Sequence, residues 1–483
     1  MRLRSVALLW ILVVATSGCG RILYRPLDAS IDAAGTDAPG VDAGLDAATF
    51  DAPDRDAPGE CTSPSVEGSP CAGGGVCREG SCCRGCWDPT SRRCLDGDAI
   101  DSCGAGGRTC RACSCLGDAC ASGLCSPASP FEAVEPGDTH TCAIRSGADV
   151  VCWGSHAIGQ TGTGPVGAGA SPRPPGFVMG GARQISGSHE HVCARTDSGV
   201  RCWGRGWEGQ LGNGVPAPSG TPVMAIADPT VVDIDTGFVT SAMALSGALV
   251  AGWGYNSAEG FLGLGAAVDD VVVPTRLPLV GVAGIGLGHT HGCIVTDMGA
   301  LRCFGANDAG QLGLGKMSAA VPTPTDATGL GGIRVASVDG GFIHTCALAE
   351  VGGLWCTGAN LDGSLGLGDR TNRATFERVG GGPYRALAMG ARGTHTCALT
   401  TSDEMLCWGR NATRQIAGLA DASIELPFWI DLGPVVAIGA GSRHTCAITL
   451  GGALYCWGDN TEGQVDAGVA SVLPADIARV CAP

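Results

Sequence analysis

A single phrase that returns seven times between Phe131 and Pro483 constrains this chain more than any other feature. It reads His-Thr-Cys-Ala-Ile or Leu, a short turn, Leu or Val-x-Cys-Trp-Gly, and then often Gly-Gln-Leu-Gly. The copies stand about fifty residues apart, the length of a four-stranded propeller blade. Apolar residues flank each turn, as in a β-hairpin. The repeat therefore predicts an all-β fold, with a seven-bladed β-propeller over residues 131–483.

Two cysteines stand nine or ten positions apart in six of the copies, and folding the hairpin places them opposite one another. Directly opposed residues without ladder hydrogen bonds have α-carbons about 4.5 Å apart, within reach of a disulfide. The third copy lacks both cysteines together, as a bonded pair predicts. We expect six structural disulfides, each contributing about 2.5–3 kcal/mol by the chain-entropy estimate. The pairs are Cys142 with Cys152, Cys193 with Cys202, Cys293 with Cys303, Cys346 with Cys356, Cys397 with Cys407, and Cys446 with Cys456.

The histidine that opens the phrase is present in six copies, and a ring of histidines suggests a metal site. Equivalent positions on separate blades are spread around a wide ring, however, so four of them cannot surround one ion. We expect each histidine to bond to backbone at a blade turn, and the tryptophan of the phrase to lie in the core between blades. We predict no metal and no other cofactor. The histidines are His140, His191, His291, His344, His395 and His444.

These residues give the phrase a resemblance to the repeat of the regulator of chromosome condensation family. A full copy is His-Thr-Cys-Ala-Ile from His444 with Cys-Trp-Gly from Cys456. The resemblance implies a seven-bladed propeller, in which closure of the ring often mixes the two chain ends. A Pro-then-apolar pattern that follows earlier copies returns at Leu473–Val480. We therefore expect the C-terminal segment to supply a strand beside Phe131.

The best-known members of this family exchange guanine nucleotides on a small GTPase and bind chromatin. This chain has a net charge of −16 and one lysine, Lys316, so we expect no nucleic-acid partner. Its paired cysteines also point away from the cytosol, where that GTPase would be. Other relatives are secreted bacterial propellers that inhibit enzymes by presenting one face of the ring, and this precedent fits the chain better.

The first residues have the pattern of an export signal. Two arginines precede an apolar run from Val6 to Ala15 that is too short to span a bilayer. Small residues then lead to Cys19, which resembles a bacterial lipobox whose cysteine becomes the acylated N-terminus, although Thr16 departs from the usual leucine. We expect residues 1–18 to be a lipoprotein signal peptide and Cys19 to be lipidated. Ordinary signal cleavage nearby is the alternative.

Two further regions separate this signal from the repeats. Residues 19–60 are rich in Asp, Ala, Gly and Pro and bury too little apolar area to offset the entropy of ordering, which predicts a disordered tether. Residues 61–125 hold thirteen cysteines and few large apolar residues, which predicts a small disulfide-rich module. A zinc or redox site at Cys83-x-x-Cys86 is the alternative, but this region contains no histidine. The odd cysteine could pair with Cys481.

A catalytic site would need a nucleophile with its base, or two carboxylates, at one place. The chain has no nucleophile-elbow Gly-x-Ser-x-Gly after an apolar strand, no His-Glu-x-x-His and no phosphate-binding loop that ends in Lys-Ser or Lys-Thr. Glu190, between His189 and His191, marks the one dense ionisable cluster, and most such clusters are polar groups at turns. We therefore predict a protein without catalytic residues.

The connections between copies differ most, at Gly162–Arg173, Val215–Val223 and Ala266–Arg276, as contact loops do. We expect a monomeric, exported scaffold at the bacterial cell envelope, in the outer membrane or on the cell surface, that touches the membrane only through its lipid anchor. Its propeller would bind a protein or a polysaccharide. The alternatives are a surface hydrolase with its active site on the propeller loops and, if the chain is cytosolic, an activity like guanine-nucleotide exchange.

Overall fold

The computed structural model describes two separate units of the chain. The described residues are short strands between 70 and 126, then 130–167, 171–238, 240–245, 249–265, 269–277, 279–416, 421–465 and 478–480. The predicted signal peptide, Cys19, the tether over residues 19–60 and Cys481 lie outside these residues. Within them the secondary structure is entirely β, and the search for a helix long and apolar enough to cross a membrane finds none.

The first unit contains seven strands of two to four residues, as short as expected where little apolar surface is available. One three-stranded sheet comprises β1 (Pro70–Cys71), β2 (Gly75–Arg78) and β3 (Ser81–Cys83). Two hairpins comprise β4 (Cys86–Asp88) with β5 (Arg93–Leu95), and β6 (Ala119–Ala121) with β7 (Leu124–Ser126). That the thirteen cysteines of this region form disulfides stays a prediction.

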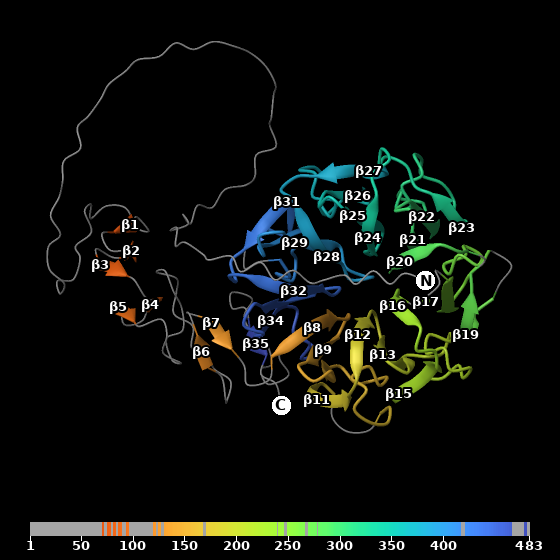
Figure 1. Ribbon diagram of the computed structural model, residues 1–483, viewed down its shortest axis with the longest axis horizontal. Helices are drawn as coiled ribbons and strands as arrows, with labels where there is room; N and C mark the ends of the chain where they lie inside the picture. Colours follow the sequence, from red (N-terminus) through yellow and green to blue (C-terminus); the bar gives the residue numbers. More distant parts are fainter. Residues whose placement is uncertain are drawn as a thin grey trace, which may run out of the picture. The chain divides into compact units, whose positions relative to one another are not determined.

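The second unit contains seven four-stranded antiparallel sheets, the blades of a propeller (Figure 1). Blade 1 comprises β8 (Phe131–Pro136), β9 (His140–Arg145), β10 (Asp149–Gly154) and β11 (Arg173–Met179). Blade 2 comprises β12 (Ala182–Gly187), β13 (His191–Thr196), β14 (Gly199–Gly204) and β15 (Ser219–Ile226). Blade 3 comprises β16 (Val231–Thr236), β17 (Thr240–Leu245), β18 (Leu249–Gly254) and β19 (Val271–Arg276).

The remaining four blades follow the same order, from the inner strand to the outer one. Blade 4 comprises β20 (Val282–Leu287), β21 (His291–Thr296), β22 (Leu301–Gly305) and β23 (Val321–Asp326). Blade 5 comprises β24 (Val335–Gly340), β25 (His344–Ala349), β26 (Leu354–Gly358) and β27 (Arg373–Val379). Blade 6 comprises β28 (Tyr384–Ala388), β29 (His395–Thr400), β30 (Met405–Arg410) and β31 (Ser423–Ile430). Blade 7 comprises β32 (Val435–Ala440), β33 (His444–Thr449), β34 (Leu454–Gly458) and β35 (Ala478–Val480).

The ring closes by packing between inner strands, because β32 of blade 7 lies against β8 of blade 1. Phe131 and Val134 share a buried cluster there with Ile448 of blade 7. The expectation that the C-terminal segment pairs beside Phe131 is wrong. The segment pairs with β34, where Val480 stands opposite Leu454. In every blade the third strand pairs on its outer side with the strand that follows it in the chain, and blade 7 keeps this order.

The hairpin of each repeat has the register that its cysteines require. The two cysteines stand directly opposite one another, as in the pairing of Cys142 with Cys152, and their α-carbons are 4.1 Å apart. All six pairs named from the sequence are bonded and buried. In blade 3 the same positions are occupied by Ala242 and Gly252. Each bridge therefore locks the two middle strands of a blade.

Antiparallel order gives the propeller two distinct faces. Connections from the first to the second strand and from the third to the fourth strand of a blade lie at one end, which we call the loop face. Turns between the second and third strands, and the connections between blades, lie at the other end, which we call the turn face. The chain enters blade 1 at the turn face, where the Phe131 amide donates to the Gly452 carbonyl at 2.9 Å.

Candidate functional site

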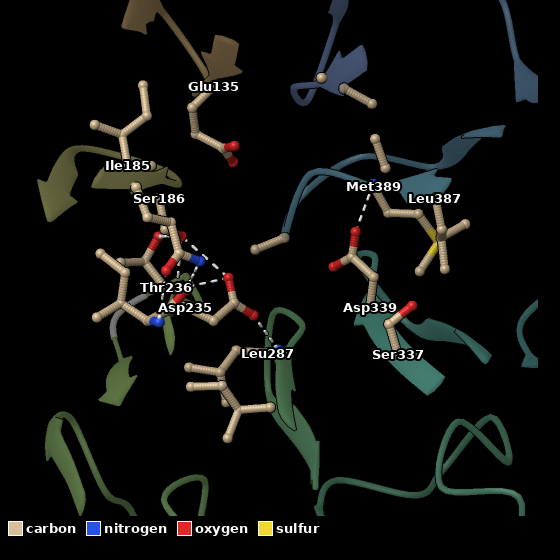
Figure 2. Close-up of a pocket in the computed structure, with 18 of the residues that line it drawn as sticks. Glu135, Ile185, Ser186, Asp235, Thr236, Leu287, Ser337, Asp339, Leu387 and Met389 are labelled. Atoms are coloured by element: carbon tan, nitrogen blue, oxygen red, sulfur yellow. Dashed lines mark hydrogen bonds between the residues drawn. The ribbon is translucent and has the colours of Figure 1, made fainter. Parts of the chain in front are cut away.

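The inner strands line a central cavity of about 270 Å³. Three carboxylates face it from the same strand position in blades 1, 3 and 5, namely Glu135, Asp235 and Asp339 (Figure 2). Asp235 Oδ2 accepts the Leu287 amide of blade 4 at 2.6 Å, and Asp339 Oδ2 accepts the Met389 amide of blade 6 at 2.8 Å. Glu135 bonds to the backbone of blade 2 in the same manner. These acids therefore join neighbouring inner strands.

Burial raises the pKa of all three carboxyl groups. The pKa of Asp235 rises to about 7, with repulsion from Asp233 adding to the effect of burial. The pKa values of Glu135 and Asp339 rise well above their ordinary values, because burial is reinforced by repulsion from Asp235. Among the described residues, no three His, Cys, Asp or Glu side chains converge on a position that could hold a metal ion.

The repeat histidines are buried. His191 bonds to the backbone of Thr240 in the next blade, as expected, but four others bond to a side chain of the next blade. At four junctions between blades, the histidine Nε2 bonds to a threonine hydroxyl of the next blade. That threonine directly follows the repeat histidine of its own blade. These contacts are His444 with Thr141 (2.8 Å), His291 with Thr345 (2.8 Å), His344 with Thr396 (3.0 Å) and His395 with Thr445 (2.8 Å). The Thr141 hydroxyl donates its own proton to the Gln464 carbonyl at 2.7 Å, so it must accept a proton from the imidazole.

Each of these imidazoles therefore carries a proton on Nε2, because the other three threonines likewise donate to a backbone carbonyl. Burial lowers the pKa of His291 and His344 to about 3. In blade 5 the third residue before the histidine has to be glycine, because a Cβ on Gly341 would lie 2.1 Å from His344 Cε1. The junction between blades 1 and 2 differs, since Val192 occupies the threonine position and both ring nitrogens of buried His140 have no partner among the described residues.

The tryptophans of the phrase lie between blades, as expected. Trp203 Nε1 donates to the Gln160 carbonyl of the preceding blade at 3.0 Å, and Trp253 Nε1 donates to the Gln210 carbonyl at 2.8 Å. Both indoles are fully buried. Neither the histidines nor these tryptophans are accessible to a partner, so the phrase that identifies the fold is structural throughout.

At the loop face, each connection after an inner strand contributes one side chain to a ring. We call these seven residues the mouth ring: Asp138, His189, Phe238, His289, Phe342, Arg392 and Ser442. Four of them form a row of aromatic ring contacts across blades 2 to 5. The ring centroids of His189 and Phe238 are 4.5 Å apart, those of Phe238 and His289 are 4.2 Å apart, and those of His289 and Phe342 are 4.6 Å apart.

Arg392 of blade 6 reaches across this ring. Its Nη1 donates to Asp138 Oδ2 of blade 1 at 2.9 Å, and its Cζ lies 5.0 Å from the centroid of the Phe238 ring of blade 3. Asp138 also accepts the hydroxyl of Ser442 from blade 7. Burial raises the pKa of Asp138, while Ser442 and Arg392 oppose that rise.

A chain of polar contacts leads outward from the ring. His189 Nε2 lies 3.4 Å from Asp138 Oδ2, and its Nδ1 lies 3.3 Å from Glu190 Oε2. Arg205 Nη1 contacts Glu190 Oε2 at 3.0 Å, and its Cζ lies 5.3 Å from the ring centroid of Trp207, which is 49% exposed. We call this chain and the mouth ring together the mouth network.

The histidine–glutamate cluster noted in the sequence is thus divided by the fold. His189 and Glu190 belong to the mouth network, whereas His191 is buried. Burial, reinforced by Arg392 and Arg205, lowers the pKa of His189 to about 3. Ser442 donates to Asp138 and not to an imidazole, so these groups do not form the serine–histidine pair of a hydrolase.

Sequence reasoning missed the mouth ring, although a signal was present. Six of its members stand two positions before the repeat histidine, or before Thr240 in blade 3, and vary in a phrase that is otherwise constant. The three variable connections lie at the loop face as well. Two of them end inside outer strands, because β15 begins at Ser219 and β19 at Val271.

Comparisons with known proteins agree with the propeller. The model of the regulator of chromosome condensation (RCC1) repeat matches residues 299–348, 386–415 and 435–464. The ultraviolet-B receptor UVR8 of Arabidopsis thaliana is 35% identical over 237 residues, which are 47% of this chain and 52% of the receptor. The X-linked retinitis pigmentosa GTPase regulator of Mus musculus is 35% identical over 156 residues, 32% of this chain and 15% of that protein. The chain thus spans about half the length of the first relative and less of the second.

Among solved structures, yeast RCC1 (Prp20) bound to Kap60 has the same fold. The TM-score is 0.60 at 19% identity, and the match covers 74% of this chain and 84% of that one. At this identity the likeness concerns the fold and not the site.

Proposed function

We propose that this β-propeller of regulator of chromosome condensation repeats is a non-catalytic module that binds a partner protein on its loop face. The observation that carries the proposal is the mouth network. It combines exposed Trp207 with Arg205 and Arg392 on the face opposite the point where the chain enters the ring. Tryptophan and arginine dominate the binding energy of protein interfaces, and side chains already held in place lose less entropy on binding.

The alternative surface is the turn face. Its exposed aliphatic side chains include Val280, Met298, Val351 and Leu450. They stand on turns and connections of three different blades, and single exposed apolar residues are normal on soluble proteins. The chain also enters the ring at this face, at Phe131.

We further propose that the protein acts outside the cytoplasm, anchored through an acylated Cys19. Six buried disulfides support this location, because a reducing cytosol would oppose them. Mass spectrometry of the native N-terminus tests the anchor. A diacylated or triacylated Cys19 is expected, and Cys19→Ala should release the protein from the membrane fraction; an intact Met1 would overturn the proposal.

The names of three similar proteins agree with a binding role. UVR8 is named as a receptor and the retinitis pigmentosa protein as a GTPase regulator, and Prp20 is seen bound to a protein, Kap60. Carried to this chain, these names suggest a partner protein. The experiment below must therefore distinguish a protein partner from a polysaccharide partner.

Site-specific photo-crosslinking tests the binding face. A photoreactive amino acid replaces Trp207 on the loop face or, as a matched control, Val351 on the turn face, which is 81% exposed. We expect one protein of defined mass to be trapped in living cells from position 207 and not from position 351. Crosslinks from position 351 alone would overturn the proposal. An adduct that resists proteases but is cleaved by glycosidases would also overturn it, because the partner would then be a polysaccharide.

A further inference from the structure

The centre of the mouth ring has the composition of a site for a cation. A carboxylate and an aromatic face, here Asp138 and Phe238, are the groups that hold guanidinium and ammonium ions in proteins. His189 and His289 flank Phe238, and both remain neutral because burial lowers their pKa values to about 3 and about 4. Ser442 fixes Asp138 from the other side. We call Asp138, Phe238 and the two histidines the cage.

The cage is occupied by a side chain of the protein itself. The Arg392 guanidinium bonds to Asp138 at 2.9 Å and lies over Phe238 at 5.0 Å, although its side chain is still 40% exposed. Among the seven connections between the first and second strands of a blade, the one that carries Arg392 is the longest. Between Gly390 and His395 there are two residues more than between Gly341 and His344 of blade 5.

Because of this extra length, the Arg392 side chain can leave the cage while the backbone contacts of its loop stay in place. The Gly393 carbonyl accepts the amide of Phe342 at 2.9 Å, as Gly341 does for His289 at 3.2 Å, so the backbone contact of this loop with blade 5 does not involve Arg392. The loop turns back on itself through the Gly393 amide and the Gly390 carbonyl at 2.7 Å. Withdrawing the arginine would break one hydrogen bond and one ring contact and would leave this backbone ladder intact.

The cavity below the cage also favours a positive charge. Its lining includes Ala391, the residue before Arg392, so the cage lies at one end of the cavity. Glu135, Asp235 and Asp339 face the same space. A cation at the mouth stabilises the ionised forms of these acids, whereas an anion would destabilise them. The cavity therefore disfavours an anionic partner group and accommodates a basic one.

From this geometry we propose that the partner protein binds by placing an arginine or lysine side chain in the cage, in exchange for Arg392. Arg392 is then an internal competitor that sets the affinity. The inference rests on the proposed function and adds to it the chemistry of the partner: a basic side chain at the tip of a loop or at a chain end.

The test uses the full-length oxidised protein and a five-residue peptide, acetyl-Gly-Gly-Arg-Gly-Gly-amide. Calorimetric titration should show Arg392→Ala binding this peptide about ten-fold more tightly than the wild type, because an internal ion pair and a cation–π contact no longer compete. Asp138→Asn added to Arg392→Ala should abolish the gain, and Asn keeps the size of the side chain. A peptide with citrulline in place of arginine, equal in shape but uncharged, should bind neither protein.

Arg334→Ala is the matched control, because Arg334 is an exposed arginine paired with Glu350 at 3.0 Å on the turn face. It should leave peptide binding unchanged. Thermal unfolding of each variant shows whether the ring is intact, and Phe238→Leu replaces Asp138→Asn if that variant unfolds. Equal affinity of Arg392→Ala and the wild type, or equal binding of the citrulline peptide, overturns the cage. Crosslinking from position 207 would then still report on the loop face, so the two proposals fail separately.

Discussion

The junction between blades 1 and 2 lacks one hydroxyl that four other junctions have, and replacing it should stabilise the protein. Val192 is fully buried where four of its equivalents are threonine, and His140 keeps both ring nitrogens unpaired among the described residues. At the preceding junction, Thr141 accepts from His444 and donates to the Gln464 carbonyl, which also accepts Trp153 Nε1 at 3.0 Å.

Val192→Thr adds the same hydroxyl with almost no change of shape. It should accept the proton of His140 Nε2 and donate to the Gln160 carbonyl, which already accepts Trp203 Nε1. A buried hydrogen bond contributes about 0.5–1.5 kcal/mol net, and an unpaired buried group costs about 1–3 kcal/mol. We therefore expect a gain of about 1–2 kcal/mol in the free energy of unfolding.

Urea unfolding with the disulfides intact measures this gain as a higher midpoint at an unchanged slope. The reciprocal variant, Thr445→Val, leaves His395 without its acceptor and should cost about 1–3 kcal/mol. If Val192→Thr is neutral or destabilising while Thr445→Val is also neutral, the histidine–threonine contacts do not stabilise the ring and the reasoning is refuted.

Three further predictions concern the blades and the cavity. Replacing Cys397 and Cys407 together with alanine should lower the free energy of unfolding by about 2.5–3 kcal/mol, measured in urea against the intact protein. Asp235 has a pKa of about 7 in the folded protein and an ordinary value near 3.8 when unfolded, so the folded state binds more protons between these values and stability should fall as pH rises from 4 to 7. Asp235→Asn should flatten that dependence in thermal unfolding at several pH values. Gly341→Ala should cost about 1–3 kcal/mol in the same assay because its Cβ meets His344, whereas Gly380→Ala, where a Cβ meets nothing within 4 Å, should be neutral.

The sequence by itself determined the blade, because everything that defines a blade is local. The two cysteines of a hairpin are nine or ten positions apart, so their pairing follows from antiparallel register alone. The fifty-residue period then indicated how many blades there are, and the tryptophan in a run of apolar residues indicated where they pack. Each of these inferences needs only one repeat at a time.

The tertiary structure alone decided what the ring presents to a partner. Arg392 and Asp138 are 254 positions apart, and they meet only because seven blades close a circle. The acceptor of four repeat histidines stands on the next blade, so its identity as a threonine hydroxyl could not follow from one copy. The mouth ring varies from blade to blade because no single-blade constraint acts on it, and the contacts among its members exist only between blades.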